Sequence, residues 1–145
     1  MANVSKLLEK KGKEIISVSP DTGIRDAVAK MAKKSSGTVL VMEDNKLVGV
    51  FSERDFIRKI YLKDGCGKDV KVSDMMSTDL TTVTADTTLE SCMNLMTDKR
   101  IRHLPVMEGD RVIGVISIGD IVKYMVNEKE FLIKNLQDYI AGPGM

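Results

Sequence analysis

The sequence has few of the residues from which most catalytic and metal centres are built. Its 145 residues include no tryptophan, one histidine, two cysteines and only 4% aromatic residues. His103 has neither a second histidine nor a cysteine near it in the sequence, so a zinc site lacks ligands. We find no Walker loop, no dinucleotide glycine fingerprint and no serine with an obvious histidine and aspartate partner set. These absences argue against a metal site and against an enzyme.

An excess of charge of one sign is also missing. The chain has 22 Lys and Arg against 21 Asp and Glu, a formal net charge of +1. Without a basic stripe that also carries aromatic residues, a nucleic-acid partner is not expected. No run approaches the roughly 18 apolar residues of a membrane span, and the N-terminus has no apolar run of the signal-peptide type. We expect a cytoplasmic protein that does not bind membranes.

The two cysteines do not form a recognisable motif. Cys66 and Cys92 are too far apart for a CxxC pair, and a disulfide framework is not expected in a reducing compartment. Cys92 lies at a helix position that matches Ala27, which predicts a buried thiol in the core. Cys66 stands between two glycines, where an exposed and reactive thiol stays open as an alternative.

What the sequence does contain is an internal repeat. Residues 18–60 recur at residues 83–125 with a constant offset of 65, and twelve of the 43 pairs are identical. Self-similarity at a fixed period indicates that each copy is one supersecondary unit that buries its apolar face against its neighbour. Two copies in a chain of this length predict one pseudo-symmetric domain. The identities include a Gly-x-x-Ser-x-x-Asp segment, which packing alone does not require.

Each copy has the pattern strand, helix, strand, strand, helix. Runs rich in β-branched residues predict the strands, apolar residues at helical spacing predict the helices, and Asp, Asn and Gly favour tight hairpins between the second and third strands. Oxygen side chains in 20–22 and 86–88 are expected to cap the first helix of each unit. The expected elements are 15–18, a helix from Ile24, 38–42, 47–52 and 54–62 in the first copy, and 80–83, a helix from Leu89, 103–107, 111–117 and 120–140 in the second.

The chain is therefore divided into four parts. We predict a first repeat over 1–63, a linker over 64–71, a second repeat over 72–126 and a C-terminal helical extension over 127–145. A short prelude, Val4–Leu8, resembles Val72–Met76 at an offset of 68. The last helix carries an apolar stripe longer than one domain needs, and a stop signal follows it at 141–144. That stripe covers the protein's own core or meets another subunit, and both alternatives stay open.

The residues with the most chemical promise lie in the two Gly-x-x-Ser-x-x-Asp segments, 49–55 and 114–120. Each stands where the third strand passes into the second helix, and unpaired backbone N–H groups at a helix start attract anions. A serine hydroxyl there suits a phosphate, and an aspartate one turn later suits the two hydroxyls of a ribose. The alternative is that Ser52 and Ser117 are N-caps and that Asp55 and Asp120 favour the helix dipole.

Three further residues are candidates for phosphate contacts. Arg102 and His103 open the second strand of the second copy, and Arg54 lies inside the first Ser-x-x-Asp segment. The alternative places Arg102 and His103 at a strand edge facing water, and Arg54 on a solvated helix.

These segments resemble the CBS domain, named for cystathionine beta-synthase, and the pair resembles a Bateman module of the stand-alone bacterial kind. The resemblance rests on both Gly-x-x-Ser-x-x-Asp segments, on 102–106 and 115–123, and on the tail 130–142. It implies an α/β (α+β) fold of tandem repeats packed with pseudo-twofold symmetry around two clefts. It also implies a non-enzymatic regulatory module for an adenosine-containing nucleotide: AMP is favoured, and ATP, NAD(H) and S-adenosylmethionine are the alternatives.

The same resemblance implies how the site residues are shared between the clefts. One cleft would combine Ser52, Arg54 and Asp55 with Leu80, Thr81, Arg102 and His103. The other would combine Ser117 and Asp120 with Ile16, Ser17, Gly37 and Thr38. Because Gly37-Thr38 stand where Arg102-His103 stand, and Gly119 stands where Arg54 stands, the first cleft would gather three possible cations and the second none from these positions. We therefore expect phosphate-rich nucleotides to prefer the first cleft.

The expected partners are the nucleotide, a second copy of the chain and an unidentified regulated protein. CBS pairs commonly associate as flat dimers through their helices, so a homodimer is the default. A second reading is a protein-interaction module with vestigial clefts, whose helices bind a partner whether or not a ligand is present.

Overall fold

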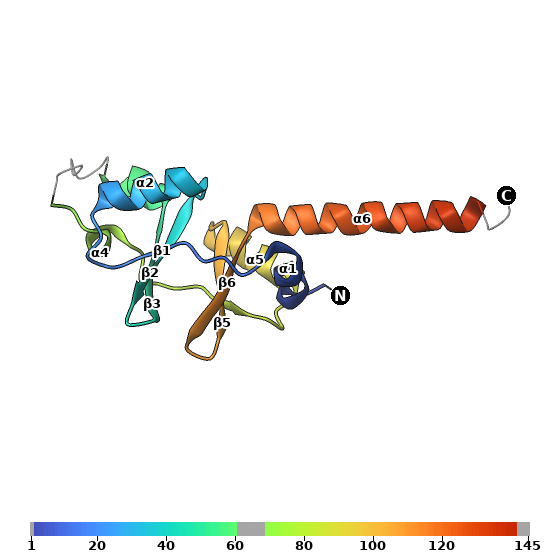
Figure 1. Cartoon of the computed structure of the whole chain (residues 1–145), viewed down its shortest axis with the longest axis horizontal. Coiled ribbons are helices and arrows are strands. Elements are labelled where there is room, and N and C mark those ends of the chain that lie inside the picture. Colours follow the sequence, from blue (N-terminus) through green and yellow to red (C-terminus); the bar gives the residue numbers. More distant parts are fainter. Residues whose placement is uncertain (1, 61–68, 142–145) are drawn as a thin grey trace.

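The chain folds into two small sheets with helices packed on them, and one long helix projects from one end (Figure 1). The structure is a computed structural model and describes residues 2–60 and 69–141. The expected α/β (α+β) tandem repeat is confirmed. Most of the expected linker, 64–68, lies outside the described residues, as do Cys66 and all but the first residue of the stop signal at 141–144.

The two repeats have the same element order. The first contains α1 (Val4–Lys11), β1 (Ser17–Val18), α2 (Ile24–Lys34), β2 (Thr38–Glu43), β3 (Lys46–Ser52), the single turn α3 (Glu53–Asp55) and the π-helix η1 (Phe56–Ile60). The second contains α4 (Val72–Met75), β4 (Val83–Thr84), α5 (Leu89–Lys99), β5 (His103–Glu108), β6 (Arg111–Ser117) and α6 (Ile118–Ala141). The two β-branched runs thus form shorter strands than expected.

The sheets have matching topology. In each, the first strand runs parallel to the second and the second runs antiparallel to the third, in the orders β1-β2-β3 and β4-β5-β6. The expected hairpins are confirmed: Asp44 and Asn45 have φ of 50° and 64°, and Gly109 has φ of 61°. Two-residue turns with positive φ match the twist of the strands that they join.

Only one of the two expected side-chain caps forms. The Thr88 Oγ1 atom accepts a hydrogen bond from Ser91 N at 3.1 Å and caps α5. The corresponding cap of α2 is Gly23, which makes no side-chain bond. The Thr22 Oγ1 atom instead accepts from Ser19 N at 3.1 Å, so the oxygen expected to cap α2 closes the turn before the helix.

The two short preludes exchange places between the repeats. Helix α1 precedes the first repeat but packs into the core of the second, where Val4, Leu7 and Leu8 join the buried side chains of α5, β5 and β6. Helix α4 precedes the second repeat but places Val72 and Met75 in the core of the first. Each buried core therefore contains residues from both predicted units.

Backbone hydrogen bonds hold both exchanged helices in equivalent positions. Val4 N donates to Thr87 O at 2.9 Å, and Val72 N donates to Thr22 O at 2.8 Å. The two donors, Val4 and Val72, are related by the prelude offset of 68, and the two acceptors, Thr22 and Thr87, by the repeat offset of 65. The exchange is therefore part of the pseudo-twofold symmetry of the molecule.

The repeated glycine of Gly-x-x-Ser-x-x-Asp serves this exchange. A Cβ atom on Gly114 would lie 2.9 Å from Leu8 Cδ2, and a Cβ atom on Gly49 would collide with the Met76 side chain. Leu8 and Met76 are equivalent residues of the two preludes. Packing of the exchanged segments thus explains why both copies have glycine here, although the sequence alone did not suggest it.

Helix α6 divides into a packed part and a projecting part. Ile121 and Tyr124 are buried in the second core, and Lys10 of α1 lies over the Tyr124 ring at 5.1 Å. All described side chains from Met125 to Ala141 are exposed, and α6 extends well beyond the sheets (Figure 1). The stripe thus covers the protein's own core only in its first two turns. Within residues 2–60 and 69–141, no helix is long and apolar enough to cross a membrane.

The expected core position of Cys92 is confirmed. Its side chain is fully buried among the second-core residues, and burial raises the pKa of the thiol to about 11. A thiol with this pKa is almost entirely protonated at neutral pH and is therefore a poor nucleophile.

The exchange of α1 predicts that a substitution near the N-terminus destabilises the second repeat. We expect Leu7→Ala to lower the free energy of unfolding by about 2–5 kcal/mol, because Leu7 is almost fully buried and its truncation leaves a cavity. Chemical denaturation measures the loss, and hydrogen exchange locates it in β5 and β6. Glu9→Ala, on the exposed side of the same helix, should change stability by less than about 0.5 kcal/mol. Equal effects of the two substitutions would contradict the exchange.

Candidate functional site

The first of two cavities between the repeats is named here the Asp55 cleft, and it has a volume of about 400 Å³. All seven residues expected in it, from Ser52 to His103, line its wall. The end of β3 supplies Ser52, helix α3 supplies Arg54 and Asp55, and the segment before β4 supplies Leu80 and Thr81. The other residues along its wall are Gly37, Thr38, Val50, Glu53, Arg58, Ser77, Asp79, Asp98, Lys99, Arg100, Ile101 and Pro105.

The second cavity, the Asp120 cleft, has a volume of about 510 Å³. Five of its six expected residues line it: Ile16, Gly37, Thr38, Ser117 and Asp120. Ser17 does not line the cleft. Neighbouring residues of an extended chain point to opposite faces, and Ile16, which directly precedes β1, takes the side toward the cleft. The Ser17 carbonyl instead accepts from Lys30 Nζ at 2.5 Å.

The Ser52–Asp55 pair forms a capping box at the start of α3. The Asp55 amide donates to Ser52 Oγ at 3.2 Å, while the Ser52 amide and hydroxyl both donate to Asp55 Oδ2 at 3.0 Å. The capping alternative is therefore correct for Ser52. Because these bonds fall on Oδ2, the other carboxylate oxygen, Oδ1, is left for a ligand hydroxyl. Lys59 Nζ lies 4.0 Å from Oδ1.

The Ser117–Asp120 pair repeats this geometry and adds a cation. The Ser117 amide donates to Asp120 Oδ2 at 2.8 Å, and the Asp120 amide donates to Ser117 Oγ at 3.0 Å. Lys11 Nζ lies 2.6 Å from the same Oδ2 atom. Burial of the Asp120 carboxyl favours its neutral form, but the hydrogen bonds from Lys11 and from the Ser117 backbone outweigh it, so the pKa lies below its ordinary value.

Thr38 and His103 form the wall that the two clefts share. These residues occupy equivalent positions in the two repeats, and Thr38 Oγ1 lies 3.0 Å from His103 Nδ1. Both residues line both cavities. Burial, reinforced by the positive charge of Lys11, holds the pKa of His103 below 6.5, so the ring is neutral at neutral pH.

The expected distribution of cations needs correction. His103 lines the Asp55 cleft as a neutral ring, so two of the three possible cations remain, Arg54 and Arg102. The Asp120 cleft is not free of cations, because Arg102 lines both clefts and Lys11 and Lys34 also line this one. The Arg54 Nη1 atom donates to Arg100 O at 2.5 Å, which ties the helix α3 to the end of α5 and excludes the fully solvated alternative for Arg54.

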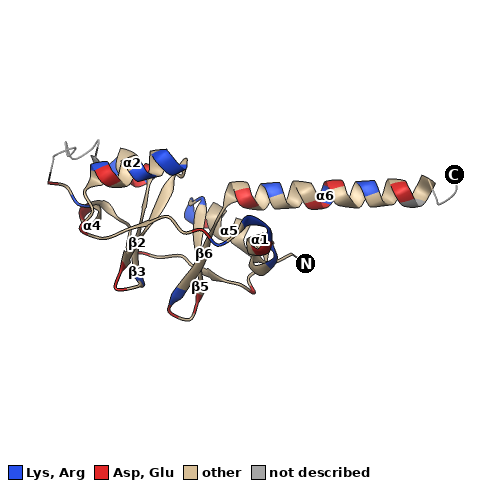
Figure 2. Cartoon of the chain, in the orientation of Figure 1, with Lys and Arg blue, Asp and Glu red and all other residues tan. Residues whose placement is uncertain are grey.

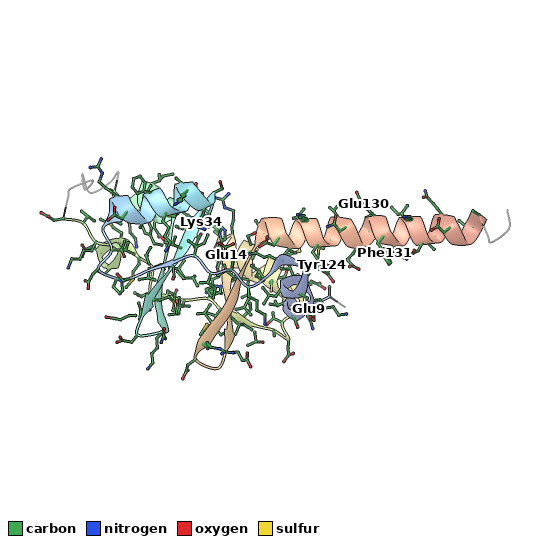
Figure 3. All side chains as sticks on the ribbon, viewed as in Figure 1. Glu9, Glu14, Lys34, Tyr124, Glu130 and Phe131 are labelled. Atoms are coloured by element: carbon green, nitrogen blue, oxygen red, sulfur yellow. The ribbon has the colours of Figure 1, made fainter. Side chains whose placement is uncertain are left out.

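Both lysines of the Asp120 cleft are paired with carboxylates that line the same cavity. Lys11 pairs with Asp120, and Lys34 Nζ lies 3.6 Å from Glu14 Oε1. Figure 3 shows Glu14 and Lys34 approaching one another where the chain passes between the repeats. Lys11 was missed in the sequence because it reaches the cleft only through the exchange of α1.

The Asp55 cleft contains further arginine and lysine side chains that sequence reasoning missed. Arg58 lies one turn after Arg54, and Lys99 and Arg100 end α5. Arg100 has φ of 55° at the C-cap of α5, which directs the chain past the cleft. Helical spacing from Arg54 would have indicated Arg58 in the sequence.

The arrangement suits binding of a polar molecule rather than covalent chemistry. Each cleft offers a carboxylate oxygen, backbone N–H groups at a helix start and cations, and both volumes fall within the range of small-molecule sites, about 300–1,000 Å³. Over residues 2–60 and 69–141, no three His, Cys, Asp or Glu side chains come together as a metal site.

Known proteins share this sequence and this fold. The chain is 36% identical over 148 residues to the mitochondrial CBS domain-containing protein CBSX3 of Arabidopsis thaliana. This alignment covers 96% of this chain and 72% of the relative. Its sequence is 44% identical to that of the CBS domain NE2398. The crystal structure of NE2398 superposes with a TM-score of 0.82 over 86% of this chain and 97% of NE2398. A CBS-domain containing protein from Agrobacterium tumefaciens, ATU1752, is 33% identical, with a TM-score of 0.82 and coverage of 86% and 99%.

Two more distant structures share the fold alone and contain ligands. The CBS domain pair of protein MJ0100, 20% identical with a TM-score of 0.76 and coverage of 88% and 98%, is in complex with 5′-methylthioadenosine and S-adenosyl-L-methionine. CBSX2, 23% identical with a TM-score of 0.71 and the same coverage, is in complex with AMP.

The sequence profile of the CBS domain matches two segments of this chain, residues 9–62 and 72–127. These segments correspond to the two structural repeats, apart from the exchanged helix α1. The chain therefore belongs to the CBS domain family and carries a tandem pair of CBS domains.

Proposed function

We propose that this protein is a non-enzymatic regulatory module that binds an adenosine-containing nucleotide, preferably AMP, in the clefts between its repeats. One observation carries the proposal: both Ser-x-x-Asp pairs line cavities of ligand size that the opposite repeat closes. A capping role alone would not place both pairs in cavities.

The proposed chemistry follows from the groups in each cleft. Oδ1 of Asp55 or Asp120 accepts from a ribose hydroxyl, and the helix start and the nearby cations bind the phosphate. Leu80 and Thr81 in one cleft, and Ile16 in the other, form the part of the wall suited to the adenine ring. The ligands of MJ0100 and CBSX2 are adenosine compounds, which supports this choice of chemical class.

The two clefts differ in how their cations are engaged. In the Asp120 cleft, Lys11 and Lys34 already have carboxylate partners, so a phosphate there competes with Asp120 and Glu14. In the Asp55 cleft, Arg54 donates to a neutral carbonyl and keeps its full charge for a ligand. Phosphate-rich nucleotides such as ATP therefore prefer the Asp55 cleft, and NAD(H) and S-adenosylmethionine are the remaining candidates.

Binding would act through the contacts between the repeats. A nucleotide touches both repeats at once and therefore favours one arrangement of the two sheets over others. The regulated partner is an unidentified protein, the compartment is cytoplasmic, and the expected association is a homodimer. The rival function, a protein-interaction module with vestigial clefts, requires no nucleotide and predicts that none stabilises the fold.

Thermal unfolding with AMP, ATP, NADH and S-adenosylmethionine tests the proposed function. A ligand at 100 times its dissociation constant adds about 2.7 kcal/mol, which raises the Tm of a domain of this size by roughly 5–10 °C. Circular dichroism is the suitable readout, since the chain has no tryptophan. We expect Asp55→Asn or Asp120→Asn to remove the AMP-dependent rise, measured against each variant's own ligand-free Tm.

Asp110→Asn is the matched control, because Asp110 lies at an exposed hairpin turn outside both clefts. It should keep the full AMP-dependent rise. If none of the four compounds shifts the Tm at millimolar concentration, the protein is the ligand-independent interaction module instead.

The assignment of phosphates to the Asp55 cleft predicts a selective loss. We expect Arg54→Ala to weaken ATP binding about tenfold and AMP binding by less, because a lost charge-assisted hydrogen bond costs about 1.5–3 kcal/mol in the absence of solvent screening. Isothermal titration calorimetry measures both affinities. Arg111→Ala removes the same charge from an exposed hairpin and should change neither affinity. Equal losses for ATP in Arg54→Ala and Arg111→Ala would contradict the assignment.

A further inference from the structure

The Asp120 cleft differs from the Asp55 cleft in having a lysine in direct contact with its aspartate. Lys11 Nζ lies 2.6 Å from Asp120 Oδ2, and it also donates to Val115 O. In the Asp55 cleft, the corresponding ion pair is looser, because Lys59 Nζ stays 4.0 Å from the aspartate. The close contact makes Lys11 part of the ligand-binding wall rather than a surface charge.

Lys11 reaches this position because α1 is longer than its counterpart α4. Helix α1 has eight residues and α4 has four. The preludes recur at an offset of 68 and the repeats at an offset of 65, so the first copy has three additional residues before β1. The residue equivalent to the end of α4 is Leu7, and α1 continues for about one more turn. This last turn is basic, with Lys10 and Lys11 (Figure 2).

The lysine replaces a backbone contact of the first repeat. Val50, the equivalent of Val115, is bridged to Ser77: Val50 N donates to Ser77 O at 3.0 Å, and Ser77 N donates to Val50 O at 2.8 Å. At Val115 the carbonyl oxygen accepts from the Lys11 ammonium instead. A neutral N–H group is thus exchanged for a charged one, and the wall of the Asp120 cleft gains one positive charge.

This charge decides the charge balance of the Asp120 cleft. The described side chains that line it have three positive and three negative charges, His103 being neutral, so the cleft has no net charge. Without Lys11, the same walls would have a net charge of −1. The Asp55 cleft has five positive and four negative side chains, a net charge of +1. The charged residues of the Asp120 cleft are Lys11, Lys34, Arg102, Glu14, Glu53 and Asp120.

We propose that Lys11 is a specificity-determining residue of the Asp120 cleft and makes it selective against adenosine compounds with a positive charge next to the ribose. S-adenosylmethionine is such a compound, because its sulfonium is attached to the 5′ carbon of the ribose. Adenosine compounds with an uncharged 5′ group, such as thioethers, fit the neutral cleft. Lys11 can act in this way only if the Asp120 cleft binds an adenosine compound, as the proposed function requires.

The selection follows from the position of Lys11 on the ribose-binding carboxylate. Alone, the Asp120 carboxylate would attract a sulfonium attached to the ribose that it binds. Lys11 cancels that attraction, so the sulfonium would lose hydration without gaining a counter-ion, whereas a neutral thioether has no such penalty. The hydroxyl site itself is kept, because Lys11 and the Ser117 amide both bind Oδ2 and leave Oδ1 of Asp120 for the ribose.

A matched pair of ligands tests this selection. S-adenosylmethionine and S-adenosylhomocysteine differ only in the methyl group that gives the sulfur its charge. Isothermal titration calorimetry measures both dissociation constants in an Asp55→Asn background, in which we expect binding in the Asp120 cleft alone. We expect the uncharged thioether to bind more tightly. We expect Lys11→Met to shift the ratio of the two constants about tenfold toward S-adenosylmethionine, the effect of one unit charge at short range in a partly exposed site.

Two further variants separate the charge of Lys11 from its packing. Lys11→Arg keeps the charge, so it should keep the original ratio even if both affinities change. Lys13→Met removes a charge from an exposed residue outside both cavities and should change the ratio by less than about twofold. Lys11 is itself exposed at the end of α1, so circular dichroism should show that all these variants fold.

The outcomes distinguish the role of Lys11 from the proposed function. A ratio that Lys11→Met leaves unchanged, or that Lys11→Arg shifts equally, would overturn the role of Lys11 although the module still binds adenosine compounds. Tighter binding of S-adenosylmethionine than of the thioether before Lys11 is replaced would also overturn it. If the Asp55→Asn chain binds neither compound, Lys11 has no ligand to select. If the chain with Asp55 intact binds neither compound and no AMP, the proposed function is wrong as well.

Discussion

The whole architecture depends on the reciprocal exchange of α1 and α4. Each short helix completes the core of the repeat to which it does not belong in sequence, and equivalent backbone bonds from Val4 and Val72 fix both positions. Neither repeat can therefore close its apolar core alone. The exchange also places the Leu8 and Met76 side chains where a Cβ atom on Gly114 and on Gly49 would lie, which accounts for the glycine in both copies.

The clefts are a product of this interlocked packing. Each has the Ser-x-x-Asp helix start of one repeat on one side and residues of the other repeat on the opposite side. Thr38 and His103, equivalent residues that contact one another, form the wall between them. The symmetry is broken mainly by charge, because α1 ends at Lys11 beside Asp120, whereas Lys59 is 4.0 Å from Asp55.

Periodicity and repetition predicted most of this fold. The order of elements along the chain and both hairpins follow from local patterns that recur in the two copies, and the length of α6 follows from its own apolar stripe. The exchange did not follow, since two five-residue preludes at an offset of 68 carry too little pattern to show which core they join. Lys11 was missed for the same reason, because its place in a cleft depends on a tertiary contact rather than on a motif. Ser17 was expected in the Asp120 cleft but does not line it. The sequence of so short a strand does not show which of its faces is directed toward the cleft. His103 was counted as a possible cation, and only the tertiary structure shows that burial lowers the pKa of its ring.

Gly37 and Glu53 contribute to the walls of both clefts and of an apolar groove between α2 and η1. The Glu53 amide donates to Gly37 O at 2.9 Å, and the Glu53 carboxylate occupies the space that a Cβ atom on Gly37 would need. A single added methyl group would thus displace one side chain and reshape three surfaces together. Evolution cannot tune the three surfaces one at a time through these two positions, and a mutational scan should record them as pleiotropic sites.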